Sequence, residues 1–208
     1  MNDVARFQQH LAACPLIAII RGVHPDEVEA VGAAIFDSGI RIIEVPLNSP
    51  NPLDSIARLA ARFGEQATIG GGTVLDPADV ARVAAAGGRI IVSPDTNPAV
   101  IGAAAAAGLV SAPGYATPTE AFAALRAGAH ALKLFPAEAA SPAVLKAQRA
   151  VLPRDVPILI VGGVSPVTIT GWRDAGADGF GLGSGLYAPG RSAREVGERA
   201  RAYVAALD

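Results

Sequence analysis

The sequence is poor in cysteine, lysine and aromatic residues, and it has no long apolar run. Cys14 is the one cysteine, which excludes an internal disulfide and is typical of proteins in a reducing cytoplasm. The formal net charge is −2, and RSAR near the C-terminus is the one cluster of cations, so charge gives no basis for nucleic-acid binding. No apolar run approaches the roughly 18 residues of a membrane span, and the polar start of the chain is a poor signal peptide. We expect a cytoplasmic protein that binds neither nucleic acid nor a membrane.

Proline and glycine, by contrast, recur at regular places along the chain. Seven times a residue is followed by proline ahead of an alanine-rich stretch, an arrangement typical of the first turn of a helix. The pairs are His24-Pro25, Asn51-Pro52, Asp76-Pro77, Asn97-Pro98, Thr117-Pro118, Ser141-Pro142 and Ser165-Pro166. The stretches stop near a glycine, the usual residue just past a helix end, at Gly39, Gly64, Gly87, Gly108, Gly128 and Gly176.

Short apolar runs lie between the predicted helices. In order they read LIAII, RIIEV, ATIG, RIIVS, LVSA, ALKLF, PILIV and GFGLG. Continuous apolar character predicts strands buried on both faces, as in a parallel sheet covered by helices. Eight strand–helix units predict an α/β fold, a (β/α)8 TIM barrel that residues 1–208 form as a single domain, with residues 1–14 as a short N-terminal helix. An open doubly wound sheet is the alternative, but neither end of the chain carries an obvious edge strand.

A lysine and a glutamate near the predicted strand ends are the first candidates for chemistry, because barrel active sites form there. Lys133 lies within the apolar run of the sixth strand and is one of two lysines against fifteen arginines. Burial lowers the pKa of an amine, and a free amine can attack a ketone to form a Schiff base. Glu44, which we expect on a neighbouring strand, is the candidate to move protons. The alternative is a buried Lys133–Glu44 ion pair that only stabilises the barrel.

Other polar groups and glycines follow the remaining strands. Arg21 ends the first strand, where a guanidinium either binds a substrate carboxylate with two hydrogen bonds or extends to solvent at the barrel rim. Thr73 follows the third strand and is a helix cap, a ligand contact or both. The glycines of VGGV and GLGSGL, after the seventh and eighth strands, either bind a phosphate together with Ser184 or simply allow tight turns.

Several other chemistries lack the residue spacing that they need. The three histidines, His10, His24 and His130, show no metal-ligand spacing, so we expect no metal and no cofactor. His130 is expected to pack at a strand start. Ser184 lacks the GxSxG spacing of serine hydrolases. The GFGLGSG stretch lies too near the end of the chain for a dinucleotide fingerprint, which needs a following strand–helix unit.

Seven motifs occur in order and with consistent spacing, and together they resemble a known family. They read IIRGV, EVPLNSP, GGGTVL, PGYATPTEAF, ALKLFPA, VGGVSP and GLGSGLY. The chain resembles the class I aldolases for 2-keto-3-deoxy-6-phosphosugar acids, the KDPG/KHG aldolase family. Asn48 and Val161 stand where the phosphogluconate branch has arginine and threonine, which resembles the branch that acts on 2-dehydro-3-deoxy-6-phosphogalactonate. By contrast, PAEAAS after the sixth strand is nearer to the gluconate branch.

The resemblance implies a role for each candidate residue. Lys133 would form the Schiff base, and Glu44 would move protons directly or through a water. The carboxylate of the pyruvyl unit would be bound by Arg21, Thr73 and the backbone near Pro94. Phe135 and Val161 would pack against the pyruvyl unit. The phosphate would be bound by Gly162, Gly163, Gly183 and Ser184. The resemblance also implies a homotrimer whose ligand is a phosphorylated keto-deoxy sugar acid.

The implied reaction is a lyase reaction that begins when Lys133 attacks the C2 ketone. Cleavage of the C3–C4 bond releases D-glyceraldehyde 3-phosphate, and hydrolysis of the imine releases pyruvate. The alternatives are the same chemistry on the gluconate epimer or on 4-hydroxy-2-oxoglutarate and, more remotely, a sugar-phosphate binder without catalysis. The phosphate glycines argue against an unphosphorylated substrate, and the pairing of Lys133 with Glu44 argues against a binder.

Overall fold

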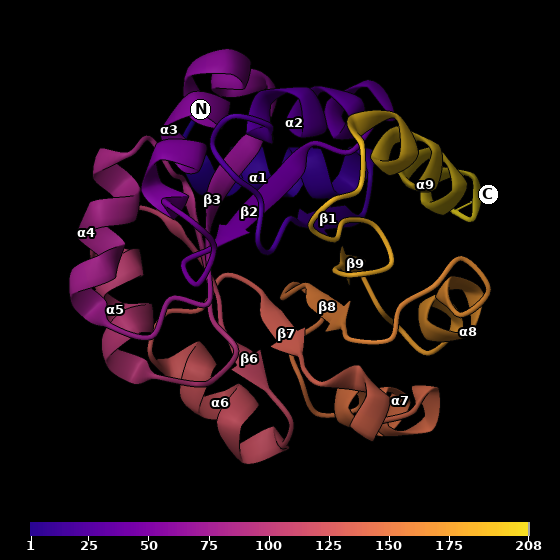
Figure 1. Ribbon diagram of the computed structural model, residues 1–208. Coiled ribbons are helices and arrows are strands. Elements are labelled where there is room, and N and C mark those ends of the chain that lie inside the picture. The colour runs from indigo at the N-terminus through magenta and orange to yellow at the C-terminus, as the bar shows by residue number, and fades with distance from the viewer. Residues whose placement is uncertain (208) are drawn as a thin grey trace.

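The chain forms a ring of parallel strands with helices outside it, as the computed structural model of residues 1–207 shows (Figure 1). The strands are β1 (Leu16–Ile19), β2 (Ile42–Pro46), β3 (Thr68–Gly72), β4 (Ile90–Val92), β5 (Val110–Ala112), β6 (Gly114–Tyr115), β7 (Leu132–Leu134), β8 (Ile158–Val161) and β9 (Gly179–Leu182). The helices are α1 (Asp3–Ala13), α2 (Val28–Asp37), α3 (Pro52–Phe63), α4 (Pro77–Ala85), α5 (Pro98–Ala106), α6 (Pro118–Arg126), α7 (Pro142–Arg149), α8 (Ile169–Asp174) and α9 (Ala193–Ala205), with short 3-10 turns η1 (Gly64–Gln66) and η2 (Ala137–Ala139). The predicted (β/α)8 barrel is confirmed.

The ring closes at Pro113, which separates β5, the fifth predicted strand, from the two-residue β6 that the sequence interpretation did not include. In the sheet order β5-β4-β3-β2-β1-β9-β8-β7-β6, these two segments are the two ends. β5 pairs with β4 and β6 pairs with β7, and between them the carbonyl oxygen of Pro113 accepts a hydrogen bond from the Lys133 N–H at 2.9 Å. One stretch of chain therefore joins both edges of the sheet, and the open doubly wound alternative is wrong.

Five of the seven predicted helix starts are confirmed at the proline itself. In α4 to α7 the residue before the proline accepts a hydrogen bond from a backbone N–H of the first turn, through Asp76, Asn97, Thr117 and Ser141. α3 also begins at its proline, although Asn51 has a left-handed backbone and caps no N–H. The six glycines predicted to end helices all have positive φ, the conformation that glycine adopts without steric cost.

The other two helix starts were predicted too early. α2 begins at Val28 rather than at Pro25, and α8 begins at Ile169 rather than at Pro166. In both cases the proline lies in a tighter turn, closed by i→i+3 hydrogen bonds from Glu27 N–H to the His24 carbonyl and from Thr168 N–H to the Ser165 carbonyl. A 3-10 type turn therefore precedes each of these helices.

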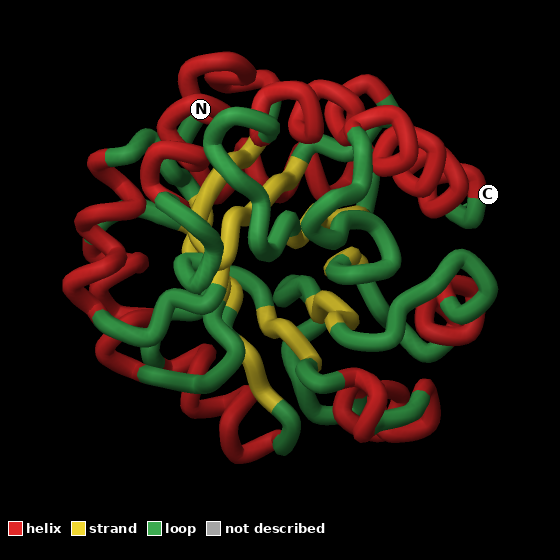
Figure 2. Tube along the Cα trace, viewed as in Figure 1, coloured by secondary structure: helices red, strands yellow, loops and turns green. Residues whose placement is uncertain are grey.

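The two ends of the barrel are covered differently. α1, the predicted N-terminal helix, places Phe7 and Leu11 in a buried cluster with barrel residues such as Ile17, Ile42 and Ile90. Ile42 and Ile90 are the first residues of their strands, so α1 covers the amino end of the barrel. At the other end, the loops that follow the strands surround the strand ends (Figure 2). No helix in residues 1–207 has both the length and the apolar character to cross a membrane.

The last helix, α9, carries a start signal that the sequence interpretation did not use. Ser192 accepts a hydrogen bond from the Glu195 N–H, and the Glu195 carboxylate accepts one from the Ser192 N–H, which is a capping box. The RSAR cluster overlaps this start. α9 packs against α2 and lies beside the loops that follow β8 and β9 (Figure 1).

Candidate active site

A cavity of about 720 Å³ lies at the carboxyl ends of the strands. It is lined by ten of the eleven sequence-predicted site residues, namely Arg21, Thr73, Pro94, Lys133, Phe135, Val161, Gly162, Gly163, Gly183 and Ser184. The eleventh, Glu44, is 1% exposed and lies below the surface of the cavity. The barrel therefore brings together residues from seven different strand ends, as the sequence interpretation expected.

Lys133 and Glu44 lie on opposite sides of the barrel rather than on neighbouring strands. Lys133 is on β7 and Glu44 is on β2, and β1, β9 and β8 separate them in one direction around the ring. The expectation of neighbouring strands is wrong, because β2 and β7 are not adjacent in the sheet. In a closed barrel, inward-facing residues of opposite strands meet across the interior. Their charges do interact, since each group shifts the pKa of the other.

Glu44 is a carboxyl group with a strongly perturbed titration. Burial raises its pKa to about 7, although Lys133 and Arg21 each act to lower the pKa. Its Oε2 atom is buried with no hydrogen-bond partner among residues 1–207, and no ion pair joins it to Lys133 within those residues. The alternative of a closed Lys133–Glu44 ion pair is therefore wrong. A carboxyl group whose pKa is near neutrality can both accept and donate a proton.

Gly72, the last residue of β3, makes room for this carboxyl group. A methyl group at position 72 would overlap the Glu44 carboxylate. Sequence reasoning noticed the glycines of GGGTV but assigned no role to Gly72. The available signal was the third consecutive glycine in a strand, since glycine inside a strand often marks the close approach of another group.

Lys133 has the environment of a reactive amine. The residue is 6% exposed, and burial lowers the pKa of its amine despite the opposing effect of Glu44. Arg21 also contributes to the lowering of this pKa. Lys133 Nζ lies 4.7 Å from the centre of the Phe135 ring. Within the cavity, the amine is thus bordered by an aromatic face and by a carboxyl group across the barrel.

Arg21 is held in place by two residues of other strand ends. Its Nη1 donates one hydrogen bond to Oδ1 of Asn48, after β2, and one of 3.3 Å to Oγ1 of Thr73, after β3. Arg21 is exposed, as the rim alternative expected, but it also lines the cavity. Thr73 does not cap α4, because Asp76 does. Thr73 instead has φ of 55°, an uncommon conformation for a β-branched residue that occurs at functional sites.

The two glycine loops lie side by side at the outer part of the cavity. Gly162 and Gly163 both have positive φ, at 108° and 63°. In the other loop, the N–H groups of Leu186 and Tyr187 both donate to the Gly183 carbonyl, which makes residues 183–187 one turn of helix. The N–H groups of the first residues of such a turn have no partner in the turn itself and can bind an anion.

Three cavity residues of α9 and one of η2 were not predicted from the sequence. Arg199, Ala202 and Tyr203 line the cavity, and their spacing places them on one face of α9. Glu138 also lines it, with its carboxylate so close to Gly162 that a side chain at that glycine would overlap it. The capping box before α9 was the signal that could have indicated a helix there.

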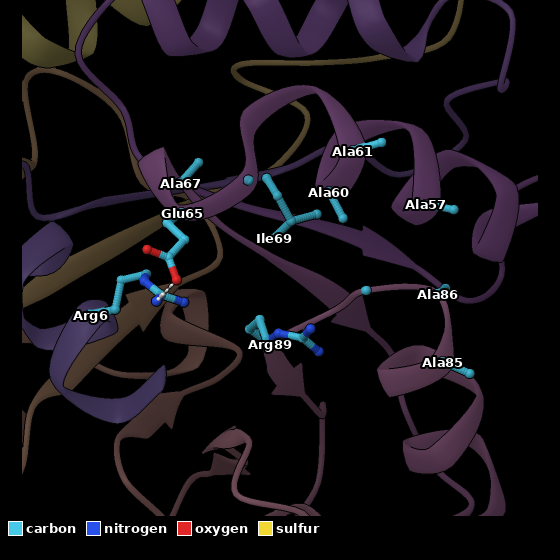
Figure 3. A pocket seen from close by; sticks show the side chains of 12 residues that line it. Arg6, Ala57, Ala60, Ala61, Glu65, Ala67, Ile69, Ala85, Ala86 and Arg89 are labelled. Atoms are coloured by element: carbon cyan, nitrogen blue, oxygen red, sulfur yellow. Dashed lines mark hydrogen bonds and ion pairs between the residues drawn. The ribbon is translucent and has the colours of Figure 1, made fainter. Parts of the chain in front are cut away.

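A second cavity, of about 430 Å³, lies at the amino ends of β3 and β4 (Figure 3). Alanines of α3 and α4 form much of its wall, together with Arg6, Glu65 and Arg89. Arg6 donates hydrogen bonds to Glu65 at 2.7 Å and to Asp3 at 2.9 Å. No sequence-predicted site residue of the described chain, residues 1–207, lines this cavity.

The histidines of the chain do not gather around a site. His10 Nδ1 lies 2.9 Å from Oγ1 of Thr68. His130 Nδ1 accepts a hydrogen bond from the Ser111 N–H beside the start of β7, where it was expected to pack. In the part of the chain that the structure describes, no three His, Cys, Asp or Glu side chains come together in a way that could hold a metal ion.

The chain matches known proteins along most of its length. The family model described as KDPG and KHG aldolase matches residues 7–192. The chain is 50% identical over 194 residues to a probable 2-dehydro-3-deoxy-6-phosphogalactonate aldolase of Rhizobium meliloti (strain 1021), which covers 93% of this chain and 92% of that protein. It is 47% identical over 192 residues to the 2-dehydro-3-deoxy-6-phosphogalactonate aldolase of Escherichia coli (strain K12), and the match covers 92% of this chain and 94% of that protein. A solved structure described as native KDPGal has a TM-score of 0.91 and 47% identity, covering 93% of this chain and 94% of that one.

Proposed function

The chain belongs to the KDPG and KHG aldolase family, and from that premise we propose that it cleaves 2-dehydro-3-deoxy-6-phosphogalactonate to pyruvate and D-glyceraldehyde 3-phosphate. The observation that carries this proposal is the placement of Lys133, a buried amine with a lowered pKa, across the barrel from Glu44. Relatives that are 47% and 50% identical bear the name of this activity, which makes the protein a carbon–carbon lyase.

Lys133 starts the reaction as a nucleophile. Its lowered pKa increases the fraction of free amine, which attacks the C2 ketone and loses water to form an imine. The protonated imine accepts the electron pair of the C3–C4 bond when that bond breaks. Glu44 takes the C4 hydroxyl proton, directly or through a water, and the aldehyde product leaves. Glu44 then returns a proton to C3 of the enamine, and hydrolysis of the imine releases pyruvate.

The remaining cavity residues position the substrate. Arg21, held by Asn48 and Thr73, binds the carboxylate together with Thr73 and the backbone near Pro94. Phe135 and Val161 pack against the pyruvyl unit. The phosphate lies at the outer end of the cavity on four residues of the two glycine loops, Gly162, Gly163, Gly183 and Ser184.

The gluconate epimer is the nearer alternative substrate. Asn48 and Val161, which distinguish the two branches, both lie at the site: Asn48 accepts a hydrogen bond from Arg21, and Val161 lines the cavity. With Arg21 supplying the cation for the carboxylate, an arginine at position 48 is not needed. The ratio of kcat/KM for the two epimers decides between them, and a ratio that favours the gluconate would reverse the assignment. A binder without catalysis would show no turnover of either.

We also propose that the protein acts in the cytoplasm as a homotrimer. The resemblance to the aldolase family supports both statements, and the single, buried Cys14 suits a reducing compartment. Sedimentation of the purified protein tests the trimer directly, and a monomer at micromolar concentration would refute it.

The first test of the mechanism is reductive trapping. The protein is mixed with pyruvate and borohydride, its intact mass is measured, and peptides are mapped. The mechanism requires one reduced pyruvyl adduct, on Lys133. The other lysine, exposed Lys146 on α7, serves as the internal control for nonspecific modification. A folded protein that forms no adduct, or forms it equally on Lys146, would exclude the Schiff-base mechanism.

A further inference from the structure

The phosphate end of the cavity contains an anion and a cation that the family resemblance does not assign. Glu138 places its carboxylate against Gly162, one of the glycines proposed to bind phosphate. The other phosphate donors are neutral, being backbone N–H groups and the hydroxyl of Ser184. A phosphate dianion beside a carboxylate is repelled unless a cation lies nearby.

Arg199 is the cation in the right place. Among residues of the described chain that line the cavity, Arg21, Lys133 and Arg199 are the basic side chains. Arg21 is hydrogen-bonded to Thr73 and Lys133 lies beside Phe135, so both contact residues assigned to the pyruvyl unit rather than to the phosphate. Arg199 reaches the glycine loop from α9, and its Nη1 donates a hydrogen bond of 3.1 Å to the Gly185 carbonyl. Gly185 directly follows Ser184, so this guanidinium lies at the proposed phosphate site.

Helix α9 also holds both glycine loops in position. Tyr203, one turn after Arg199, donates its hydroxyl to the Val164 carbonyl in the loop after β8, at 3.0 Å. The same hydroxyl lies so close to Gly185 that a side chain there would overlap it. Residues i and i+4 share one face of a helix, so Arg199 and Tyr203 contact the two halves of the phosphate site from the same direction.

Arg191, just before α9, completes this arrangement. Its Nη1 donates to the carbonyl of Ser184 at 3.0 Å and to the carbonyl of Leu186 at 2.7 Å. The carbonyls of residues 184–186 are thus all held by guanidinium groups, while the first N–H groups of the 183–187 turn stay free of bonds within the turn. Arg191 does not line the cavity, so it supports the turn rather than touching the ligand.

We propose that Arg199 is a phosphate-binding residue, which supplies from α9 the positive charge that the glycine loops lack. One of its five donors is used by the Gly185 carbonyl, and the others can form charge-assisted hydrogen bonds to phosphate oxygens. Arg199 thereby sets the preference for phosphorylated over unphosphorylated substrates. This inference rests on the proposed function, because the phosphate in question is that of the substrate.

The test measures binding of inorganic phosphate by calorimetry, which needs no catalysis. We expect Arg199→Gln to weaken phosphate binding about tenfold. Arg199→Lys should weaken it less, since lysine keeps the positive charge but cannot form the bidentate hydrogen bonds of a guanidinium. Arg194→Gln is the matched control, because Arg194 is on the same helix, is exposed and forms a salt bridge of 2.6 Å with Glu198 on the same helix. Unchanged binding in Arg199→Gln, or an equal loss in Arg194→Gln, would overturn the proposal, as would a wild-type protein that binds no phosphate at millimolar concentration.

A second readout separates this inference from the proposed function. In the condensation direction, Arg199→Gln should raise the KM for D-glyceraldehyde 3-phosphate about tenfold and leave the rate with D-glyceraldehyde unchanged, whereas a misfolded cavity would affect both. Trapping of pyruvate on Lys133 should be normal in Arg199→Gln. Loss of the pyruvate adduct in the wild-type protein would refute the aldolase, while the calorimetric comparison would still decide on Arg199.

Discussion

Asn48 accepts a hydrogen bond from the guanidinium of Arg21, so a residue of the loop after β2 fixes a cation that follows β1. We expect Arg21→Leu to raise the KM for the sugar acid about a hundredfold, because the substrate carboxylate loses its charged partner. Asn48→Ala should raise the KM only about fivefold, which corresponds to the net free energy of the one hydrogen bond that Arg21 loses. Steady-state kinetics measures both. If Asn48→Ala had the larger effect, Asn48 itself would be the carboxylate ligand.

Lys133→Met should lower kcat by roughly 10⁴-fold or more, since methionine fills the space but has no nucleophile. The melting temperature should stay the same or rise, because an amine with a pKa lowered by burial destabilises the folded state. Lys146→Met, on the exposed face of α7, is the matched control and should retain full activity. Turnover by Lys133→Met that survives purification to homogeneity would contradict the mechanism.

Glu44 should control the pH dependence of cleavage. Its pKa is raised to about 7 by burial, and the ionised form is the one that accepts the C4 hydroxyl proton. We therefore expect kcat/KM to rise as the pH increases through about 7, as the macroscopic titration of the coupled Glu44 and Lys133. In Glu44→Gln this rise of kcat/KM with pH should disappear, and most of the rate should be lost. If the variant's kcat/KM still rose through the same pH range, the titration would belong to another group.

The same carboxyl group should make stability depend on pH. Because the folded-state pKa lies above the ordinary value of 4.5, the folded protein binds more protons than the unfolded chain between pH 4.5 and about 7. Its free energy of unfolding therefore falls as the pH rises through this window, by up to roughly 3 kcal/mol. Denaturant titrations of the wild type and Glu44→Gln at pH 5 and pH 8 measure this. Relative to the wild type, the free energy of unfolding of Glu44→Gln should be higher at pH 8 than at pH 5. The same difference between variant and wild type at both pH values would count against the raised pKa.

Gly72→Ala should damage the site through Glu44 rather than through the barrel. The added methyl group would overlap the Glu44 carboxylate, so we expect a loss of stability of roughly 1–3 kcal/mol and a large loss of activity. In a double-mutant cycle with Glu44→Ala the stability loss should shrink, because the obstructing group is gone. Gly102→Ala in α5, where an added methyl group meets nothing within 4 Å, is the control and should be neutral or slightly stabilising. Additive effects in the cycle would place the clash elsewhere.

Most of the fold follows from proline, glycine and apolar runs. A proline after Asp76 or Thr117 fixes both the first helical residue and the cap, because each acts through bonds within a few residues. Pro25 and Pro166 show the limit of this signal, since a 3-10 turn and an α-helix can start with the same dipeptide.

The candidate site shows a different limit. Lys133 could be found because a charged residue in an apolar run is a local anomaly. Glu138 and Arg199 could not, because each matters only through a residue far away in the sequence, and for Gly72 the three consecutive glycines signal a close approach without saying that Glu44 makes it. The wrong expectation that Glu44 would neighbour Lys133 has a different cause. The predicted barrel already implied that its second and sixth strands lie opposite each other, and the expectation did not use this order.

The covering of the amino end by α1 gives the barrel a single entrance. Substrate and both products must then pass through the carboxyl end, where Gly163 and Ser184 are exposed and Lys133 is buried. In the proposed mechanism pyruvate stays bound to the buried Lys133 while the phosphorylated aldehyde lies against the exposed loops. We therefore expect ordered release, with the aldehyde first and pyruvate last, and the reverse order of binding in condensation.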